Sequence, residues 1–247
     1  MSEFDIVITV GAKDVDNVRN TIPYTKCNVL GYRNIYIVSV DPSLRVDGCI
    51  TIAEDMFPFS TDTVTKLHGK LERNPWYLQQ LIKLYAGRVI PGILDRWLVL
   101  DSDLYFLRPT KFINEQDQCM YSFADENWKF YFDHMARMNP EWKRVHEDKS
   151  GITHHMMMEK KYIEEIFVDV ESRYPDDAGF YETFLKCVHH GRRCHAGASE
   201  YEMYFNYMLL NHADKIEVRE LKFSECRGLF DIDPNVDCMS WHWHHRC

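Results

Sequence analysis

The segment RWLVLDSDLYFLRP, from Arg96 to Pro109, constrains the fold more than any other stretch of this chain. Four apolar residues, Trp97 to Leu100, are followed at once by Asp101, Ser102 and Asp103, and the chain then becomes apolar again. This pattern predicts a buried strand with two carboxylates at its tip. Because isolated buried charge is costly, such carboxylates require a cationic partner.

Strands alternate with helices in the first half of the sequence, which predicts a mostly parallel sheet flanked by helices. Strands are expected at residues 4–10, 34–40, 49–52 and 97–100, with helices at 14–24 and from Asn74 to 90. Asn74 is the expected N-cap of that helix and Pro75 its first helical residue. The second half is mixed, with strands expected at 118–123 and 152–158 and helices at 160–174 and 200–210. No linker or repeat divides the sequence, so residues 1–247 are expected to form one α/β domain.

Charge and composition exclude several classes of protein. The net charge is -9 and there is no basic stretch, which argues against a nucleic-acid partner. The acidic start of the chain does not resemble a secretory signal, and no apolar stretch is long enough for an integral membrane segment. The eight cysteines are scattered without a CxxC pair, which favours reduced thiols and a cytoplasmic location.

The two carboxylates after Leu100 are candidate metal ligands. In open parallel sheets, ligands bind beyond the carboxyl ends of the strands. Asp101 and Asp103 are two residues apart, so on an extended segment they point the same way. Two hard oxygen ligands with open positions for phosphate oxygens are typical of a site for Mn2+ or Mg2+. The alternative is a pair of turn-forming carboxylates that accept hydrogen bonds from local amides.

The stretch LVLDSDLYFLRP resembles the Asp-x-Asp motif of GT-A glycosyltransferases, in which a strand ends in carboxylates that bind the metal-diphosphate of a nucleotide sugar. NPWYLQQLIKLYA before it, SEYEMYFNYM after it and the terminal Trp-His segment are similar to one poorly characterised GT-A branch of bacterial and viral enzymes. The similarity spans Ile6 to His244. It implies a GT-A-like Rossmann-type fold and glycan biosynthesis. A sugar would pass from a nucleotide-diphosphate sugar, commonly UDP-linked in similar enzymes, to a hydroxyl of a carbohydrate acceptor.

Two strand tips and one helix face are candidates for donor binding. Thr9-Val10-Gly11 and Ser39-Val40-Asp41 end neighbouring strands and are expected to flank the base and ribose, with Gly11 allowing close approach. Trp76, Gln79, Gln80 and Lys83 fall on one helix face, where Lys83 is a point charge suited to phosphate. An ordinary solvated polar face is the alternative. The candidate donor-binding residues are Thr9, Val10, Gly11, Ser39, Trp76, Gln79, Gln80, Lys83, Asp101 and Ser102.

The segment from Ser199 carries the candidate catalytic base. Ser199 is the expected N-cap of a helix whose first turn holds Glu200 and Glu202, and the helix dipole alone could account for both carboxylates. The resemblance to inverting GT-A enzymes implies that Glu200 deprotonates the acceptor hydroxyl, with Glu202 in reserve, although a retaining mechanism stays open. His155, ahead of His154, is a further candidate on the acceptor side.

The end of the chain holds candidate metal ligands. His242 and His244 share one face of an extended segment, and the resemblance implies that one of them completes the metal shell. A zinc site made with Cys238 and Cys247 is the alternative, although the spacing matches no standard finger.

Two other functions compete with glycosyl transfer. A metal-dependent nucleotidyltransferase or phosphohydrolase would use the same acidic pair and further carboxylates, for which Asp125 and Asp133 are candidates. A non-catalytic module would bind a nucleotide sugar without consuming it.

Overall fold

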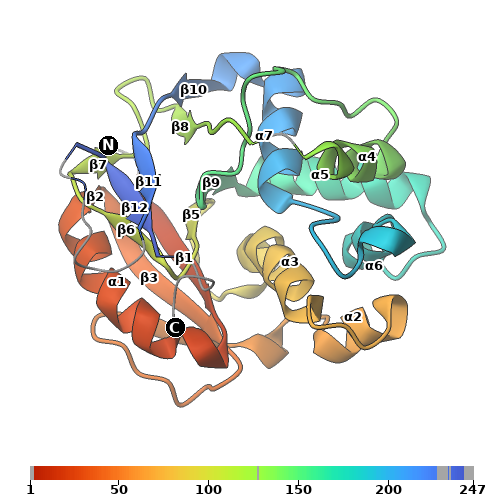
Figure 1. The fold of residues 1–247 in the computed structure, drawn as a ribbon, viewed down its shortest axis with the longest axis horizontal. Coiled ribbons are helices and arrows are strands. Elements are labelled where there is room, and N and C mark those ends of the chain that lie inside the picture. The colour runs from red at the N-terminus through yellow and green to blue at the C-terminus, as the bar shows by residue number, and fades with distance from the viewer. Residues whose placement is uncertain (1–2, 127, 227–232, 234, 242–247) are drawn as a thin grey trace.

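A five-stranded sheet forms the centre of the computed structural model, which describes residues 3–126, 128–226, 233 and 235–241 (Figure 1). Its strands lie in the order β4 (Ile50–Ala53), β3 (Tyr32–Ser39), β1 (Phe4–Val10), β5 (Arg96–Leu100) and β9 (His155–Glu159). The first four are parallel, and β9 is antiparallel to β5. All seven residues of β1 are buried, as expected for the central strand of a sheet covered on both faces.

Helices flank this sheet, and β3 and β1 pass between α1 and α3 in Figure 1. The helices are α1 (Val15–Asn28), α2 (Thr61–His68), α3 (Asn74–Val89), α4 (Lys129–Met138), α5 (Lys160–Arg173), α6 (Phe180–Lys186) and α7 (Glu200–Asn211). Short 3-10 turns occur at Ala12–Asp14, Glu54–Met56, His190–Arg192 and Ala213–Lys215. The predicted α/β class, with a mostly parallel sheet between helices, is therefore confirmed.

Three smaller sheets make the second half mixed, as predicted. One joins β11 (Phe223–Glu225), β12 (Cys238–Ser240) and β6 (Leu104–Phe106), the strand that follows the Asp-Ser-Asp turn. The other two pair β10 (Ile216–Arg219) with β8 (Cys119–Ser122), and β2 (Val29–Leu30) with β7 (Thr110–Lys111).

The structure corrects two helix boundaries. The first helix was expected to stop near Pro23 but continues to Asn28, because Ile22 and Thr25 are buried and the Asn28 amide donates to Phe106 O at 2.6 Å. Tertiary contacts thus outweigh the hydrogen bond that proline cannot donate. Asn74 was expected to be the N-cap of α3, but Arg73 is. The Asn74 side chain instead donates to Gly69 O at 2.8 Å, which ties the end of α2 to α3.

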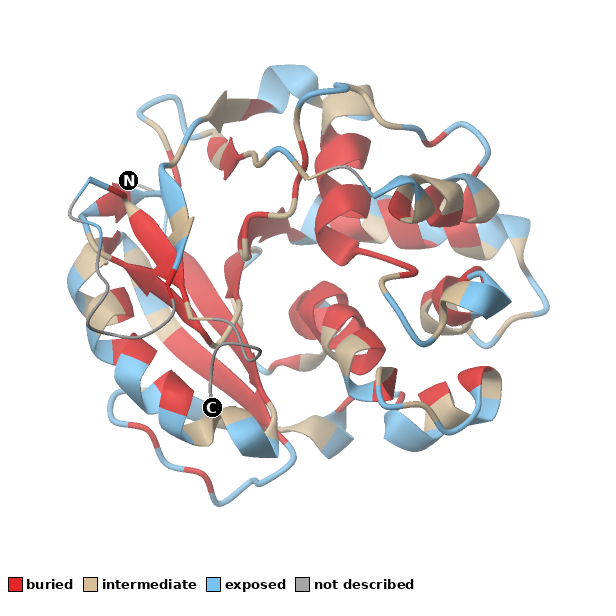
Figure 2. Cartoon of the chain, viewed as in Figure 1, coloured by how far each residue is buried: buried red, intermediate tan, exposed pale blue. Residues whose placement is uncertain are grey.

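Buried apolar side chains from both halves of the sequence join in one hydrophobic core, and Figure 2 shows the central strands almost entirely buried. The single domain over residues 1–247 stays a prediction. Within the described ranges, no helix combines the length and the apolar character that crossing a membrane would require. The seven cysteines in these ranges are free thiols.

Two buried histidines make the stability of this fold depend on pH. His134 Nε2 donates to Phe184 O at 2.8 Å, and His155 packs against the rings of Phe106 and Phe112. Burial lowers the pKa of each imidazole to about 3 from an ordinary value of 6.5. Both histidines are therefore neutral in the folded protein at the pH where an unfolded chain already binds protons.

We expect these two imidazoles to cost stability as the pH falls from 6.5 towards 3. The unfolded state binds protons that the folded state excludes, so each histidine removes about 1.4 kcal/mol per pH unit. Urea unfolding between pH 7 and pH 5 measures the effect. His134→Gln should flatten the pH dependence, whereas His146→Gln, at an exposed position, is the control. Equal slopes for wild type and His134→Gln would contradict the assignment.

Candidate functional site

The Asp101–Asp103 turn links β5 to β6, and neighbouring segments fix its backbone. The carbonyl of Ser102 accepts hydrogen bonds from Asn17 Nδ2 at 2.9 Å and Thr21 Oγ1 at 3.2 Å, both on α1. The carbonyl of Asp103 accepts the Trp241 N–H at 3.1 Å. The two carboxylates therefore sit on a braced turn at the carboxyl end of β5, at the edge of the sheet that the sequence indicates.

The Asp101 carboxylate is the meeting point of several segments that are distant in sequence. Its Oδ1 accepts from Lys83 Nζ at 2.6 Å and from Tyr201 OH at 2.9 Å. Its Oδ2 accepts from His154 Nδ1 at 3.0 Å. The side chain remains 27% exposed, so it is within reach of a ligand. We call Lys83, Asp101, His154, Glu200 and Tyr201 the Asp101 cluster.

Lys83 is the cation that meets this carboxylate. Besides Asp101, its Nζ donates to Glu200 Oε1 at 2.7 Å and to Tyr201 OH at 3.0 Å. An ammonium has three N–H donors, so these partners use all of them. The side chain is only 5% exposed and lies over the Tyr201 ring, 4.3 Å from its centroid. In this structure Lys83 neutralises carboxylates, and its expected contact with a phosphate stays a prediction.

The pKa values of the two carboxyl groups in the cluster are shifted in opposite directions. Burial alone would raise the pKa of Asp101, but Lys83 and His154 outweigh it and hold that pKa well below the usual range. For Glu200 burial dominates, so its pKa is raised despite the Lys83 ammonium. The two carboxylates hold the pKa of Lys83 above its usual value, although burial opposes this. At neutral pH Asp101 is therefore a firm anion, whereas Glu200 binds a proton more readily than an ordinary glutamate.

His154, and not His155, is the histidine in contact with Asp101. Its backbone has a φ of 61°, in the left-handed region that a residue with a side chain rarely adopts. Its carbonyl accepts the Asp101 N–H at 2.9 Å, and its ring stacks on Phe223 with 5.2 Å between centroids. His155 Nε2 instead lies 3.2 Å from Ser122 Oγ, and a catalytic role for His155 stays a prediction.

Glu202, the second candidate for the base, holds the segment at Ser150 and Gly151, which precedes His154. It accepts hydrogen bonds from Ser150 Oγ at 2.5 Å, the Gly151 N–H at 3.1 Å and Asn206 Nδ2 at 3.0 Å. Both of its carboxylate oxygens are thereby engaged. Ser199 is the N-cap of α7, as predicted, and accepts the Glu202 N–H at 3.2 Å.

The predicted polar face of α3 packs against α7 over part of its length. Gln80 is buried, and its Oε1 accepts the Glu200 N–H at 3.1 Å. Trp76 and Gln79, nearer the start of the helix, are partly exposed, and the Arg73 guanidinium lies 5.3 Å from the Trp76 ring. The half of this face that carries Gln80 and Lys83 is therefore buried against α7, next to the Asp101 cluster.

The tips of the first two long strands lie at the same edge of the sheet as Asp101. Val10 of β1 pairs with Ser39 of β3, and Ile8 of β1 pairs with Leu100 of β5. Thr9 and Asp101 each follow the Ile8–Leu100 pair by one residue, so they lie at the same level of the sheet. Thr9, Val10 and Ser39 are buried, and Gly11 is partly exposed. Nucleotide binding at these tips stays a prediction.

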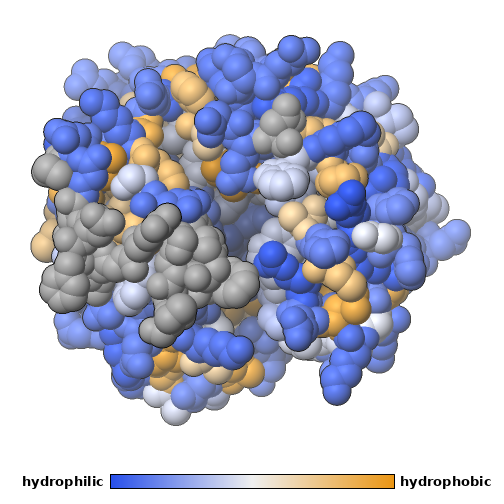
Figure 3. Space-filling view, in the orientation of Figure 1, coloured by the Kyte–Doolittle hydropathy of each residue, from blue (hydrophilic) through white to orange (hydrophobic). Residues whose placement is uncertain are grey.

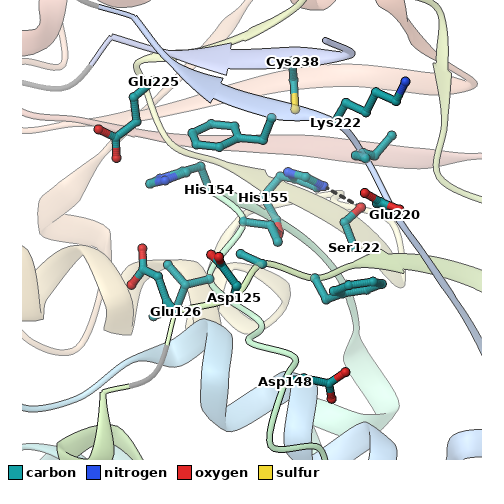
Figure 4. Close-up of a pocket in the computed structure, with 16 residues that line it drawn as sticks. Ser122, Asp125, Glu126, Asp148, His154, His155, Glu220, Lys222, Glu225 and Cys238 are labelled. Atoms are coloured by element: carbon teal, nitrogen blue, oxygen red, sulfur yellow. Dashed lines mark hydrogen bonds between the residues drawn. The ribbon is translucent and has the colours of Figure 1, made fainter.

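A cavity of about 570 Å³ opens beside His154 (Figure 4). Its lining comes from β8 and the loop after it, from the segment before β9, and from β11 with the residues that precede it. His154 and His155 both contribute to it. Figure 3 shows the face drawn in Figure 1 hollowed near its centre, where β5 faces α3 and α7, with mostly hydrophilic residues around the hollow.

The donor atoms at the turn fit an ion that binds through few protein ligands. Mg2+ is commonly held by one or two carboxylates and by substrate phosphates. Asp101 is partly exposed, whereas Asp103 is buried and lies in a turn and not on the extended segment that was expected to point both carboxylates the same way. Among the described residues, no group of three or more His, Cys, Asp or Glu side chains is arranged to hold a metal. His242 and His244 lie outside the described residues.

The described residues named for the alternative sites are not among the hydrogen-bond partners of Asp101. Cys238 is buried on β12, and burial raises its pKa to about 12, which disfavours the thiolate that zinc requires. Asp133 pairs with Lys129 at 2.5 Å on α4, and Asp125 lines the cavity.

Comparisons with known proteins identify a family but no activity. A family model described as "Family of unknown function (DUF6492)" matches residues 6–225. Among solved structures, mouse xyloside xylosyltransferase 1 in its apo form matches with a TM-score of 0.46 and 11% identity, over 99% of each chain. With a TM-score below 0.5, this likeness supports no conclusion about the chain. No curated protein matches the sequence.

We expect Lys83→Met to destabilise the protein by about 3–5 kcal/mol, because it leaves two carboxylates without their shared buried cation. Adding Glu200→Gln should recover part of the loss, since it removes one of the two charges. Urea unfolding at neutral pH measures both variants. Lys129→Met is the matched control, because its pair with Asp133 is exposed and such pairs contribute less than about 1 kcal/mol. A loss no larger than that of the control would contradict the role of Lys83.

Proposed function

The chain belongs to the DUF6492 family, a family of unknown function, and we propose that it is a metal-dependent glycosyltransferase that uses a nucleotide-diphosphate sugar. One observation carries the proposal: β5, α3, α7 and the segment before β9 all bring polar side chains to Asp101 at the carboxyl edge of the sheet. This is the edge at which α/β sheets bind their ligands. The proposed donor is UDP-linked and the proposed acceptor is a carbohydrate hydroxyl.

The donor would lie over the tips of β1 and β3, with its diphosphate at the Asp101–Asp103 turn. Asp101 and Asp103 would hold Mn2+ or Mg2+ there, and His242 or His244 is proposed to add a ligand. The ion would supply charge stabilisation to the departing diphosphate. The turn is suited to this role because Asn17, Thr21 and Trp241 brace its backbone, which fixes where the carboxylates stand.

Glu200 is the proposed general base. In the reaction, a bond forms between the acceptor oxygen and the anomeric carbon, the bond from that carbon to the diphosphate breaks, and Glu200 takes the hydroxyl proton. Its raised pKa suits a group that must accept a proton near neutral pH. Glu202 is less suitable, because both of its oxygens already accept hydrogen bonds. Attack from the side opposite to the diphosphate would invert the anomeric centre.

Donor consumption across a panel of nucleotide sugars, with manganese present, tests this function. We expect the wild type to consume one class of donor. Asp103→Asn should lose manganese-dependent binding of the nucleotide diphosphate in calorimetry while keeping its melting temperature. Asp214→Asn, at an exposed position far along the sequence, is the control. Binding of a donor that is never consumed would indicate a binding module. Unchanged manganese dependence in Asp103→Asn would refute the metal assignment.

We expect Glu200→Gln to lower kcat by about 10²–10⁴-fold, because a general base acts only as the transition state forms. The dissociation constant of the donor should stay near that of the wild type. Glu202→Gln is the comparison, and it should mainly lower the melting temperature, since Glu202 orders the segment at Ser150 and Gly151. If Glu202→Gln abolished turnover and Glu200→Gln did not, the base would be Glu202.

A further inference from the structure

We infer that the cavity beside His154 is the acceptor subsite and that it selects sugars carrying a free, protonated amine. This inference rests on the proposed function, because it assigns the acceptor of the same reaction. Its basis is the chemistry of the cavity lining and the position of the cavity against the Asp101 cluster.

The charge of the lining is strongly one-sided. Five carboxylates line the cavity and only one lysine, Lys222, accompanies them; the carboxylates belong to Asp125, Glu126, Asp148, Glu220 and Glu225. Figure 4 shows them placed around the cavity on several sides. Asp125, Asp148 and Glu220 are exposed and form no ion pair with any residue that the structure describes. A cavity of this charge attracts cations and repels phosphates and sugar acids.

The size of the cavity favours an organic cation over a metal ion. No group of three or more of them, with or without His or Cys, is arranged for a metal within the described part of the chain. A cavity of about 570 Å³ is instead of the size that holds a small organic ligand. A sugar with a protonated amine can reach several separated carboxylates, whereas a metal ion requires them within one coordination shell.

One further side chain favours a sugar as the ligand. Phe223 is 38% exposed and lines the cavity, which offers an apolar ring face for the C–H groups of a sugar.

The cavity adjoins the proposed chemistry through one residue. The imidazole of His154 lines the cavity, stacks on Phe223 and donates to Asp101. A sugar resting on the face of Phe223 opposite His154 is thus connected to the Asp101 carboxylate through two stacked rings, those of Phe223 and His154. The negative lining also disfavours the donor diphosphate, so the strand tips remain the proposed site of the nucleotide.

Calorimetry with two matched tetrasaccharides tests the inference. The probes are the β-1,4-linked glucosamine tetramer and its fully N-acetylated counterpart, which share a backbone and differ in positive charge. At slightly acidic pH and low salt we expect the glucosamine tetramer to bind at least about tenfold tighter, with the difference shrinking at high salt. Equal binding, tighter binding of the acetylated probe, or no binding of either would overturn the inference.

Variants of the unpaired carboxylates test whether the glucosamine tetramer binds in this cavity. The cavity variant Asp125→Asn/Asp148→Asn/Glu220→Gln should lose the preference for the glucosamine tetramer. The control Asp95→Asn/Asp176→Asn/Glu72→Gln, which changes the same residue types at exposed positions outside the cavity, should keep it. A preference that survives in the cavity variant would overturn the inference.

Separate binding of UDP with manganese distinguishes this failure from that of the proposed function. If UDP binds and a donor is consumed while the amine preference is absent, only the acceptor inference fails. If the amine preference is present and depends on the cavity but no donor is bound, the proposed function fails and the cation-selective sugar site stands.

Discussion

One buried ammonium between two carboxylates sets the geometry on which the rest of the site depends. Lys83 lies between Asp101 at the sheet edge and Glu200 at the start of α7, with 2.6 and 2.7 Å contacts. Removing one partner from a buried group of charges costs far more stability than removing one partner of a surface ion pair. The three segments that carry Lys83, Asp101 and Glu200 are therefore held in one arrangement. Because there is one lysine for two carboxylates, two further donors, Tyr201 and His154, complete the hydrogen bonding of Asp101.

The carboxylates of the Asp101–Asp103 turn and the carboxylates that line the cavity suit different ligands. The turn on the β1 side offers carboxylates that need a metal ion before they can accept a diphosphate, so donor binding there would depend on the ion. The cavity beside His154 is lined by carboxylates, has the volume of a small organic ligand and borders an exposed aromatic ring. The same excess of negative charge can therefore serve two different ligands, because the cavity adds room and an apolar ring face that suit an organic cation.

The sequence was sufficient for those parts of the fold that local pattern determines. Runs of buried β-branched residues locate β1, β3 and β5, and the polar residues after them locate the strand tips. Local pattern does not record which elements pair. The antiparallel register of β9 with β5, with Leu100 opposite His155, leaves His154 next to Asp101, and a shift by one residue exchanges the two histidines. For the same reason local pattern does not reveal the contacts of Lys83, since its partners Asp101 and Glu200 are 18 and 117 residues away in sequence. Tyr201 was missed because it resembles the other core aromatics of α7.

His154 connects these observations, since it belongs to the turn and to the cavity at once. Its left-handed backbone is unfavourable by about 1 kcal/mol or more for a residue with a side chain, and its two hydrogen bonds with Asp101 offset that cost. A ligand that stacks on Phe223 would press on the ring that donates to Asp101. Any movement of that ring changes the hydrogen bonding of the Asp101 carboxylate at the turn, because His154 Nδ1 donates to its Oδ2. In this arrangement, filling the cavity and tuning the strand-tip carboxylate are coupled through one imidazole.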